Sequence, residues 1–147
     1  MLTIIADKKN INNDEIIITE KSDCNHIQNV YRLRENDDLR VVDGEYEYLT
    51  KIIKMTKKEV KLKIKQKNND KYSLNINIDA GIGILKNEKM TIAIKKLTEI
   101  GINKIIPLQT ERVVVKINEK KDKWDIIAKE TLKQCKGVKF TNISPVI

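Results

Sequence analysis

The sequence is poor in cysteine, histidine and aromatic residues, and these shortages exclude several kinds of chemistry. Its 147 residues include two cysteines, one histidine, one tryptophan and one phenylalanine. Cys24 and Cys135 lie far apart and outside any C-x-x-C arrangement, so the sequence indicates neither a disulfide framework nor a zinc site. A single histidine, His26, cannot supply a multi-histidine metal centre or a conventional triad whose histidine lies downstream. We therefore expect no metal-dependent chemistry.

Long apolar runs are missing as well. No stretch approaches the roughly 20 apolar residues of a membrane helix, and the N-terminus has no basic segment ahead of an apolar core. We therefore expect no membrane association and a cytoplasmic location. Hydrophobic residues nevertheless make up 40% of the chain, which is enough apolar material for a folded core. The length suits one ordinary domain or two small ones, and the patterns described below favour two.

Arginine is scarce in a chain that is otherwise rich in basic residues. The 29 basic residues outnumber the 21 acidic ones, which gives a net charge of +8 and suits a polyanionic partner such as nucleic acid. Only four of them are arginine, namely Arg32, Arg34, Arg40 and Arg112. The guanidinium group binds phosphates through paired hydrogen bonds that lysine cannot reproduce, so the arginines are candidates for specific contacts. The alternatives are that some arginines form surface ion pairs and that the lysines reflect the base composition of the gene.

The first seventy residues carry short β patterns. Apolar patches that predict strands occur at residues 2–5, 16–18, 39–42 and 46–52. Asp43 and Gly44 lie between two of these patches and predict a hairpin turn. A lysine-rich stretch further on alternates charged and apolar residues, which puts Val60, Leu62 and Ile64 on the buried face of another strand. Several short strands predict a compact barrel.

One short helix is expected among these strands. Asp23 or Asn25 is positioned to cap it. The helix would cover residues 26–33 and present Ile27, Val30 and Tyr31 on one face. His26, Arg32 and Arg34 would then lie near one another and form a surface for phosphate and base contacts. The alternative for His26 is a cap or a residue of the core.

A polar run over residues 66–71 predicts the boundary between a first domain, residues 1–70, and a second, residues 71–147. A strand is expected just after the boundary and runs into Gly81-Ile-Gly83. Its alternating apolar residues are Leu74, Ile76 and Ile78. The two glycines fit a dinucleotide-binding turn poorly, because Lys86 occupies the place of the third glycine.

The second domain then follows the order strand, helix, strand. Asn87 is placed to cap a helix that ends before Gly101. The apolar face of this helix comprises Met90, Ala93, Ile94, Leu97 and Ile100. Residues 102–106 predict a short strand closed by Pro107, which completes a βαβ unit of a parallel sheet. Loops at the carboxyl ends of such strands form the usual ligand crevice, where Glu99, Glu111 and Arg112 could converge. The alternative is a structural Glu–Arg pair.

A second helix is expected over residues 118–135, followed by an approach to another strand over residues 142–147. The core face of the helix comprises Trp124, Ile127, Ala128, Thr131, Leu132 and Cys135. Lys129, Lys133 and Lys136 share a stripe on the opposite face. This stripe is either a solvated surface or a contact for nucleic acid.

Several motifs in order resemble the ribosomal RNA small subunit methyltransferase E family. The first is His26 to Asp38 with the following Val42-Asp-Gly, similar to the family's H-x-x-V-L-R-L-x-x-G-D and D-G signatures. Lys96 to Ile102 is similar to K-A-T-E-L-G-V, and Thr110-Glu-Arg resembles S-E-R. The other matching positions are Pro107, Trp124, Glu130 and Gln134. The resemblance covers most of the chain.

The resemblance implies an α+β two-domain chain, in which an N-terminal PUA-like RNA-binding β-barrel is followed by the first part of a SPOUT-type α/β methyltransferase domain with a parallel sheet. The family transfers a methyl group from S-adenosylmethionine to N3 of a uridine in small-subunit ribosomal RNA and acts as a homodimer. By position, His26, Arg32, Arg34, Lys129 and Lys133 are expected to contact RNA. Glu99, Arg112 and Gln134 are expected to line or support the methyl-transfer site.

The family's C-terminal knot and its glycine-rich cofactor loop have no counterpart in these 147 residues. We therefore expect this chain to be a truncated form that lacks most of the cofactor site and is inactive alone. The competing hypothesis is a stand-alone RNA-binding or ribosome-associated module without catalysis, for which the net charge of +8 and the barrel suffice.

Overall fold

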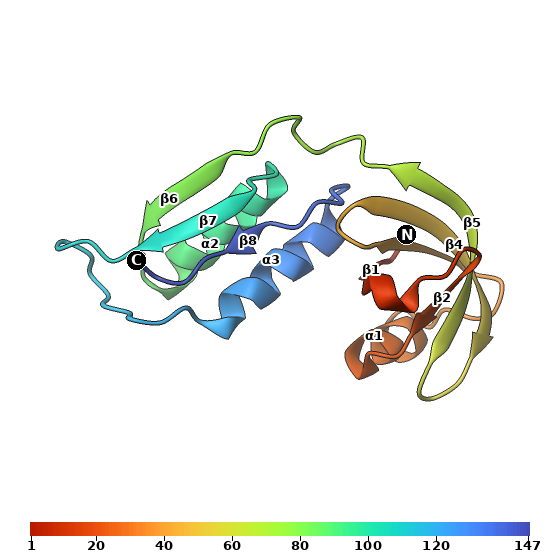
Figure 1. Cartoon of the computed structure of the whole chain (residues 1–147). Coiled ribbons are helices and arrows are strands. Elements are labelled where there is room, and N and C mark those ends of the chain that lie inside the picture. The colour runs from red at the N-terminus through yellow and green to blue at the C-terminus, as the bar shows by residue number, and fades with distance from the viewer. The chain divides into compact units, whose positions relative to one another are not determined.

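A computed structural model describes residues 1–147, which divide into two compact units, Met1–Lys71 and Tyr72–Ile147 (Figure 1). Unit 1 is built on a five-stranded sheet in the order β1-β3-β4-β5-β2. The strands are β1 (Thr3–Ile5), β2 (Glu15–Ile18), β3 (Asp38–Val42), β4 (Tyr46–Met55) and β5 (Val60–Asn69). Only β1 and β3 pair in parallel, and the other neighbours are antiparallel. Two register shifts between β4 and β5 mark bulges, which increase local twist and help the sheet curl into a half-barrel.

The concave face of this sheet carries the core of unit 1. The alternation in β5 places Val60 and Leu62 completely out of solvent and leaves Ile64 partly covered, as predicted. The predicted hairpin at Asp43 and Gly44 is also confirmed: Asp43 N–H donates to the carbonyl oxygen of Tyr46 at 3.3 Å, and Gly44 has a φ of 94°. A left-handed conformation of this kind suits glycine. However, β5 continues to Asn69, so most of the polar run from residue 66 belongs to a strand.

The helical segment of unit 1 differs from the prediction. Helix α1 (Lys21–Asn25) begins earlier, and a π turn (His26–Val30) follows it directly. The π turn closes its hydrogen bonds over five residues, as in Tyr31 N–H to the His26 carbonyl oxygen at 2.9 Å. The wider turn breaks the helical spacing of the apolar residues. Ile27 is therefore fully buried, whereas Val30 and Tyr31 are 57% and 55% exposed.

Unit 2 holds a three-stranded parallel sheet in the order β6-β7-β8. Its strands are β6 (Asp79–Gly83), β7 (Lys104–Leu108) and β8 (Asn142–Ile143). Helix α2 (Asn87–Glu99) connects β6 to β7, and helix α3 (Asp122–Gln134) lies between β7 and β8 and packs against α2. The core between sheet and helices comprises Met90, Ile94, Ile102, Ile105, Trp124, Ala128 and Ile143. With the half-barrel of unit 1, this arrangement confirms the predicted fold class.

The C-terminus of α2 is specified by glycine, as predicted. Gly101 has a φ of 81°, and its N–H donates to the Thr98 carbonyl oxygen at 3.0 Å. Ile102 N–H donates to the Leu97 carbonyl oxygen at 3.1 Å, which completes a Schellman motif. The N-terminus differs from the prediction. Asn87 is already the first helical residue, and Lys86 precedes it without a side-chain cap.

Three further expectations for unit 2 need correction. The strand expected from Leu74 begins only at Asp79, because no neighbouring strand pairs with residues 73–78, and the apolar side chains there are exposed. Pro107 lies inside β7 instead of closing it. The carbonyl oxygen of Pro107 accepts a hydrogen bond from Ile147 N–H. The backbone N–H that proline lacks would point to the same side of β7, where β8 has already ended. Helix α3 begins at Asp122, four residues later than expected.

No helix combines the length and apolar character required to cross a membrane.

Candidate nucleic-acid interface

Arg32 and Arg34 lie on a loop of unit 1 whose backbone is tied to β4. Asn36 N–H donates to the Ile52 carbonyl oxygen at 2.8 Å, and Ile52 N–H donates to the Asp37 carbonyl oxygen at 3.0 Å. The side chain of Asp37 accepts from Arg34 N–H at 2.7 Å. Both arginine side chains are exposed, and neither forms an ion pair. The loop therefore presents two guanidinium groups without an ion-pair partner on a fixed backbone, as a phosphate contact requires.

His26 lies one turn before these arginines. It is half-buried, and its ring meets Tyr31 edge to face, with centroids 6.2 Å apart and planes inclined by 80°. Tyr31 itself is exposed. The histidine therefore supports an exposed aromatic ring beside the arginines.

Arg40 has a structural role. Its side chain is only 10% exposed, and Nε donates to Oε1 of Glu47 at 2.5 Å. A second nitrogen donates to the Thr3 hydroxyl at 3.3 Å, which links β1, β3 and β4. The hydrogen bond from Arg40, with another from Asn68, lowers the pKa of Glu47. An ion pair was the alternative role considered for some arginines, and Arg40 has this role. Its pair with Glu47 is largely buried and not at the surface.

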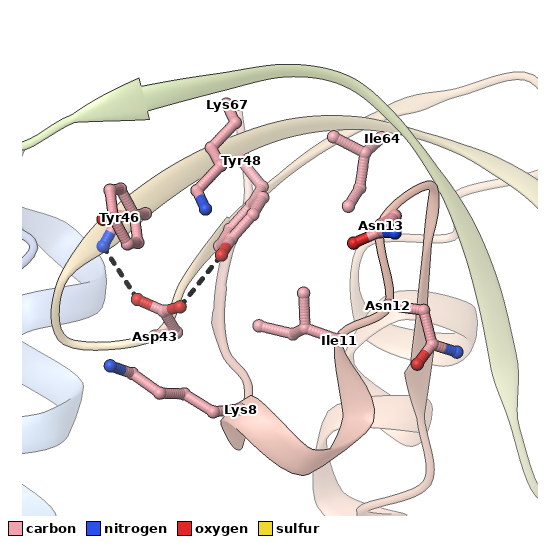
Figure 2. Close-up of a pocket in the computed structure, with 9 residues that line it drawn as sticks. All are labelled: Lys8, Ile11, Asn12, Asn13, Asp43, Tyr46, Tyr48, Ile64 and Lys67. Carbon is pink, nitrogen blue, oxygen red and sulfur yellow. Dashed lines mark hydrogen bonds between the residues drawn. The ribbon is translucent and has the colours of Figure 1, made fainter.

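Unit 1 also contains a cavity of about 380 Å³ that the sequence did not reveal (Figure 2). It lies between the β3–β4 turn, the segment after the first short helical turn, and β5. Its lining residues are Lys8, Ile11, Asn12, Asn13, Asp43, Tyr46, Tyr48, Ile64 and Lys67. The available sequence signal was the pair Tyr46 and Tyr48 at spacing i, i+2 directly after the Asp-Gly turn. By itself this pattern predicts only one strand of a hairpin.

The carboxylate of Asp43 organises this cavity. It is buried and accepts hydrogen bonds from the backbone N–H of Glu45 at 2.9 Å, the N–H of Tyr46 at 2.8 Å and the hydroxyl of Tyr48 at 3.0 Å. Burial, together with the bond to Asp43, raises the pKa of Tyr48 to about 12, so the phenol remains a donor at neutral pH. Lys8, at the rim, forms an ion pair with Glu45.

The three residues expected at a methyl-transfer site do not come together in unit 2. Helix α2 runs back from the carboxyl end of β6 to the amino end of β7, and α3 likewise returns to the amino end of β8. Glu99 and Gln134, at the ends of these helices, therefore lie at the amino edge of the sheet. Arg112 lies four residues after the end of β7 and therefore follows the opposite, carboxyl edge of the sheet. The predicted convergence of Glu99 with Arg112 is not observed, because both crossover helices reverse the chain direction.

The loop that carries Arg112 is closed at its base by Gln109, which the sequence did not identify as important. Its side-chain oxygen accepts from Ile117 N–H at 2.6 Å, and its side-chain nitrogen donates to Asn118 Oδ1 at 3.1 Å. The backbone N–H of Gln109 donates to the Ile147 carbonyl oxygen at 2.7 Å. Arg112 is exposed near the tip and forms no ion pair. Glu99 instead pairs with Lys96 at 3.1 Å.

The lysine stripe on α3 is less uniform than expected. Lys129 is exposed, but the side chain of Lys133 is only 16% exposed and pairs with Glu130 at 3.2 Å. Lys136 lies beyond the helix, and its ammonium group sits 5.7 Å from the centre of the Tyr72 ring. No group of three or more histidine, cysteine or acidic side chains is placed to hold a metal ion.

A curled, PUA-like sheet with exposed arginines, followed in the same chain by a parallel α/β unit, defines the class of RNA methyltransferases with an N-terminal PUA domain. Comparison with known families agrees. The model described as "RNA methyltransferase PUA domain" matches residues 18–65, and the one described as "RNA methyltransferase domain" matches residues 72–147, more than half of the chain. The chain belongs to the ribosomal RNA small subunit methyltransferase E family.

Curated relatives carry that family name. The protein from Bacillus subtilis is 30% identical over 118 residues, which cover 76% of this chain and 46% of the relative. The protein from Mesomycoplasma hyopneumoniae is 32% identical over 128 residues, which cover 84% of this chain and 52% of the relative. The chain thus spans about half the length of the curated relatives it matches. One similar solved structure is that of ribosomal RNA small subunit methyltransferase E from Neisseria gonorrhoeae bound to S-adenosyl methionine. It superposes with a TM-score of 0.88 and covers 100% of this chain and 62% of the other. At 19% identity, the match shows a shared fold.

Proposed function

We propose that the protein takes part in the transfer of a methyl group from S-adenosylmethionine to N3 of a uridine in small-subunit ribosomal RNA. The observation that carries this proposal is the tandem match of a PUA domain and a methyltransferase domain of the same class of enzyme in one chain. The curated relatives are named for methylation of this RNA. The net charge of +8 and the unpaired arginines of unit 1 suit a polyanionic substrate.

In this proposal, unit 1 holds the RNA. Arg32 and Arg34 would bind phosphate groups, and Lys129 and Lys133 of α3 would add positive charge, with Lys129 the more available of the two. His26 would act through Tyr31, whose exposed ring can stack on an unpaired base.

In unit 2, Arg112 is the best candidate for the methyl-transfer site, because it lies beyond the carboxyl ends of the parallel strands, where ligands usually bind. Gln109 would position it by closing the base of its loop. Glu99 and Gln134 would support the domain from the opposite edge of the sheet. Methylation at N3 also requires removal of the N3 proton and exclusion of water.

We also propose that the residues of unit 2 do not by themselves form a complete cradle for S-adenosylmethionine. A cofactor often lies against a glycine whose missing side chain leaves room for it, but a Cβ built on Gly83 would only touch Val113 at 3.8 Å, an ordinary contact. On Gly81 it would meet Leu108 at 3.2 Å. A Cβ at either glycine would therefore lie against a side chain of this chain, and neither position indicates a cofactor cradle. We expect isothermal titration of the 147-residue chain with S-adenosylmethionine to show no tight binding, and submicromolar binding would contradict this expectation.

The function is best tested in the cells that make the protein. Disruption of the gene should remove one 3-methyluridine from small-subunit ribosomal RNA, measured by nuclease digestion and mass spectrometry. A plasmid copy should restore it. A copy with Arg112→Ala should restore little, whereas Lys116→Ala, which removes a like charge from the same exposed loop, should restore it fully. If disruption leaves 3-methyluridine unchanged, the proposed activity is wrong, and cross-linking of the protein to the small subunit would then favour an RNA-binding module without catalysis.

We also propose that the protein works as a homodimer in the cytoplasm, where its ribosomal substrate is found. Exposed isoleucines on and beside the helices of unit 2 support an apolar contact between copies, namely Ile92, Ile100 and Ile126. Analytical ultracentrifugation should show a dimer. A monomer at all concentrations would contradict the proposal.

A further inference from the structure

We propose that the cavity of unit 1, which we call the tyrosine pocket, binds one unpaired nucleotide of the RNA substrate. The pocket is defined by Asp43, Tyr46, Tyr48 and Lys67 on one side, Asn12 and Asn13 on the other, and Ile11 and Ile64 between them (Figure 2). This inference rests on the proposed function, because it assumes that RNA is the ligand of the protein.

The pocket has a suitable size and rigid walls. Its volume of about 380 Å³ falls within the range of roughly 300–1,000 Å³ that small-ligand sites occupy. Asp43 uses both carboxylate oxygens to fix the turn at Tyr46 and the ring of Tyr48. The wall that carries both tyrosines is therefore preorganised, which reduces the entropy lost on binding.

The pocket has two apolar side chains between its walls and free polar groups at its mouth. Ile11 and Ile64 project into the space between the two walls (Figure 2). Asn12 and Asn13 are exposed, and their side-chain amides form no hydrogen bond within the protein. A carboxamide presents one acceptor and two donors, which match the hydrogen-bonding edge of a base that is not paired with another strand.

Lys67 supplies positive charge at the same place. Its ammonium group lies 3.8 Å from the centre of the Tyr46 ring and 5.8 Å from that of Tyr48, so the two rings hold the side chain over the pocket. Unlike Lys61 and Lys65 of the same strand, which pair with Glu15 and Asp38, Lys67 has no carboxylate partner. It is therefore available for the phosphate of a nucleotide whose base enters the pocket.

A duplex cannot offer such a ligand, because its bases are stacked and paired. The pocket should therefore distinguish single-stranded from double-stranded RNA, whereas the exposed arginines, which contact phosphates, should bind both. This difference separates the proposal from general electrostatic attraction.

The test measures binding of the complete chain to two fluorescently labelled RNAs, a short single strand of mixed sequence and a duplex of the same length. Asn13→Ala and Tyr46→Leu should each weaken binding of the single strand by about tenfold and leave binding of the duplex nearly unchanged. Tyr46→Phe, which keeps the ring, should restore most of the affinity. Lys67→Gln should also weaken binding of the single strand. Lys63→Gln is the matched control, because it removes the same charge from an exposed and unpaired position on the same strand outside the pocket.

Asn13→Ala keeps the test decisive even if Tyr46→Leu fails to fold, because Asn13 is exposed and has no partner. The proposal is overturned if the pocket variants bind the single strand as the unmodified chain does, if Lys63→Gln weakens binding as much as Lys67→Gln, or if duplex binding falls equally. It is also overturned if the unmodified chain binds no single strand. None of these outcomes depends on methyl transfer, so loss of 3-methyluridine on gene disruption could still support the proposed function.

Discussion

The two units differ in how completely they bury their apolar residues. Unit 1 exposes four large hydrophobic side chains and unit 2 exposes ten, although the units are of nearly equal length. The half-barrel closes around its own core, whereas the three-stranded sheet of unit 2 leaves apolar side chains in water on both helices and on the segment before β6. Because buried apolar area is the main source of folding free energy, unit 2 should be the less stable part.

The largest effect is expected in the core of unit 2, and Trp124 allows it to be seen. This buried residue is the only tryptophan, so its fluorescence reports on unit 2. Ile105 is fully buried in the central strand, and Ile105→Ala should lower the free energy of unfolding of unit 2 by about 2–5 kcal/mol. In urea titrations, the tryptophan transition should move to lower concentration and precede the loss of circular dichroism from unit 1.

The matched control for this prediction is Ile52→Ala, which deletes the same atoms at an equally buried site in unit 1. It should shift the later part of the circular dichroism transition, to which unit 1 contributes, and leave the tryptophan transition and the helical signal of unit 2 nearly in place. If both variants shift both signals together, the units unfold as one, and the difference in apolar exposure has no consequence for stability.

The next effect concerns the buried ion pair of unit 1. Arg40→Met should cost about 2 kcal/mol, less than the roughly 3–5 kcal/mol of a fully buried pair, because Glu47 is still 22% exposed. The lowered pKa of Glu47 means that its contribution to stability is present above the carboxyl group's ordinary value of 4.5 and is lost as the pH falls through the lower value in the folded state. Acid titrations followed by circular dichroism should show this loss in the unmodified chain, and Arg40→Met should reduce it. An unchanged acid profile would contradict the assignment.

A smaller effect is expected at the glycine that ends α2. Gly101→Ala should destabilise unit 2 by about 1–2 kcal/mol, because the residue has a φ of 81°. A Cβ there would meet nothing within 4 Å, so the cost is purely conformational. Gly83→Ala, at a site without positive φ and with only an ordinary contact to Val113, should be neutral or slightly stabilising. Tryptophan fluorescence measures both, and equal losses would contradict positive φ as the cause.

Local patterns predicted most elements because short-range physics decides them. The Asp43-Gly44 turn and the glycine after α2 each require only neighbouring residues. The alternation of Val60 and Leu62 was confirmed because β5 has a partner strand on each side. The same alternation wrongly predicted a strand at Leu74 and Ile76, because a strand needs a pairing partner and a local sequence pattern does not show whether one is present. Pro107 was misplaced for the same reason: a proline is tolerated inside β7 only because of where β8 ends.

For the candidate sites too, local sequence features could be interpreted, but contacts between distant segments could not be predicted. The scarcity of arginine drew attention to Arg32 and Arg34, which are exposed and have no carboxylate partner; their contact with RNA stays a prediction. Tertiary pairing decided that Arg40 is structural. The tyrosine pocket was missed because its walls come from three segments that meet only in the curled sheet, and the convergence of Glu99 with Arg112 failed because the direction of the helices separates them.

The smallest change in stability, and the sharpest difference in function, should come from Arg32→Ala and Arg112→Ala. Both side chains are exposed and unpaired, so each variant should change the free energy of unfolding by less than about 0.5 kcal/mol. In binding assays over a range of salt concentrations, Arg32→Ala should weaken RNA affinity and reduce the slope of log affinity against log salt by about one, as expected for one lost phosphate contact. Arg112→Ala should leave affinity nearly unchanged and lower the rate of methyl transfer in the complete enzyme, because its loop follows the carboxyl end of β7. If both variants reduce RNA affinity equally and neither changes the rate of methyl transfer once RNA is bound, the two units do not divide RNA binding and methyl transfer between them.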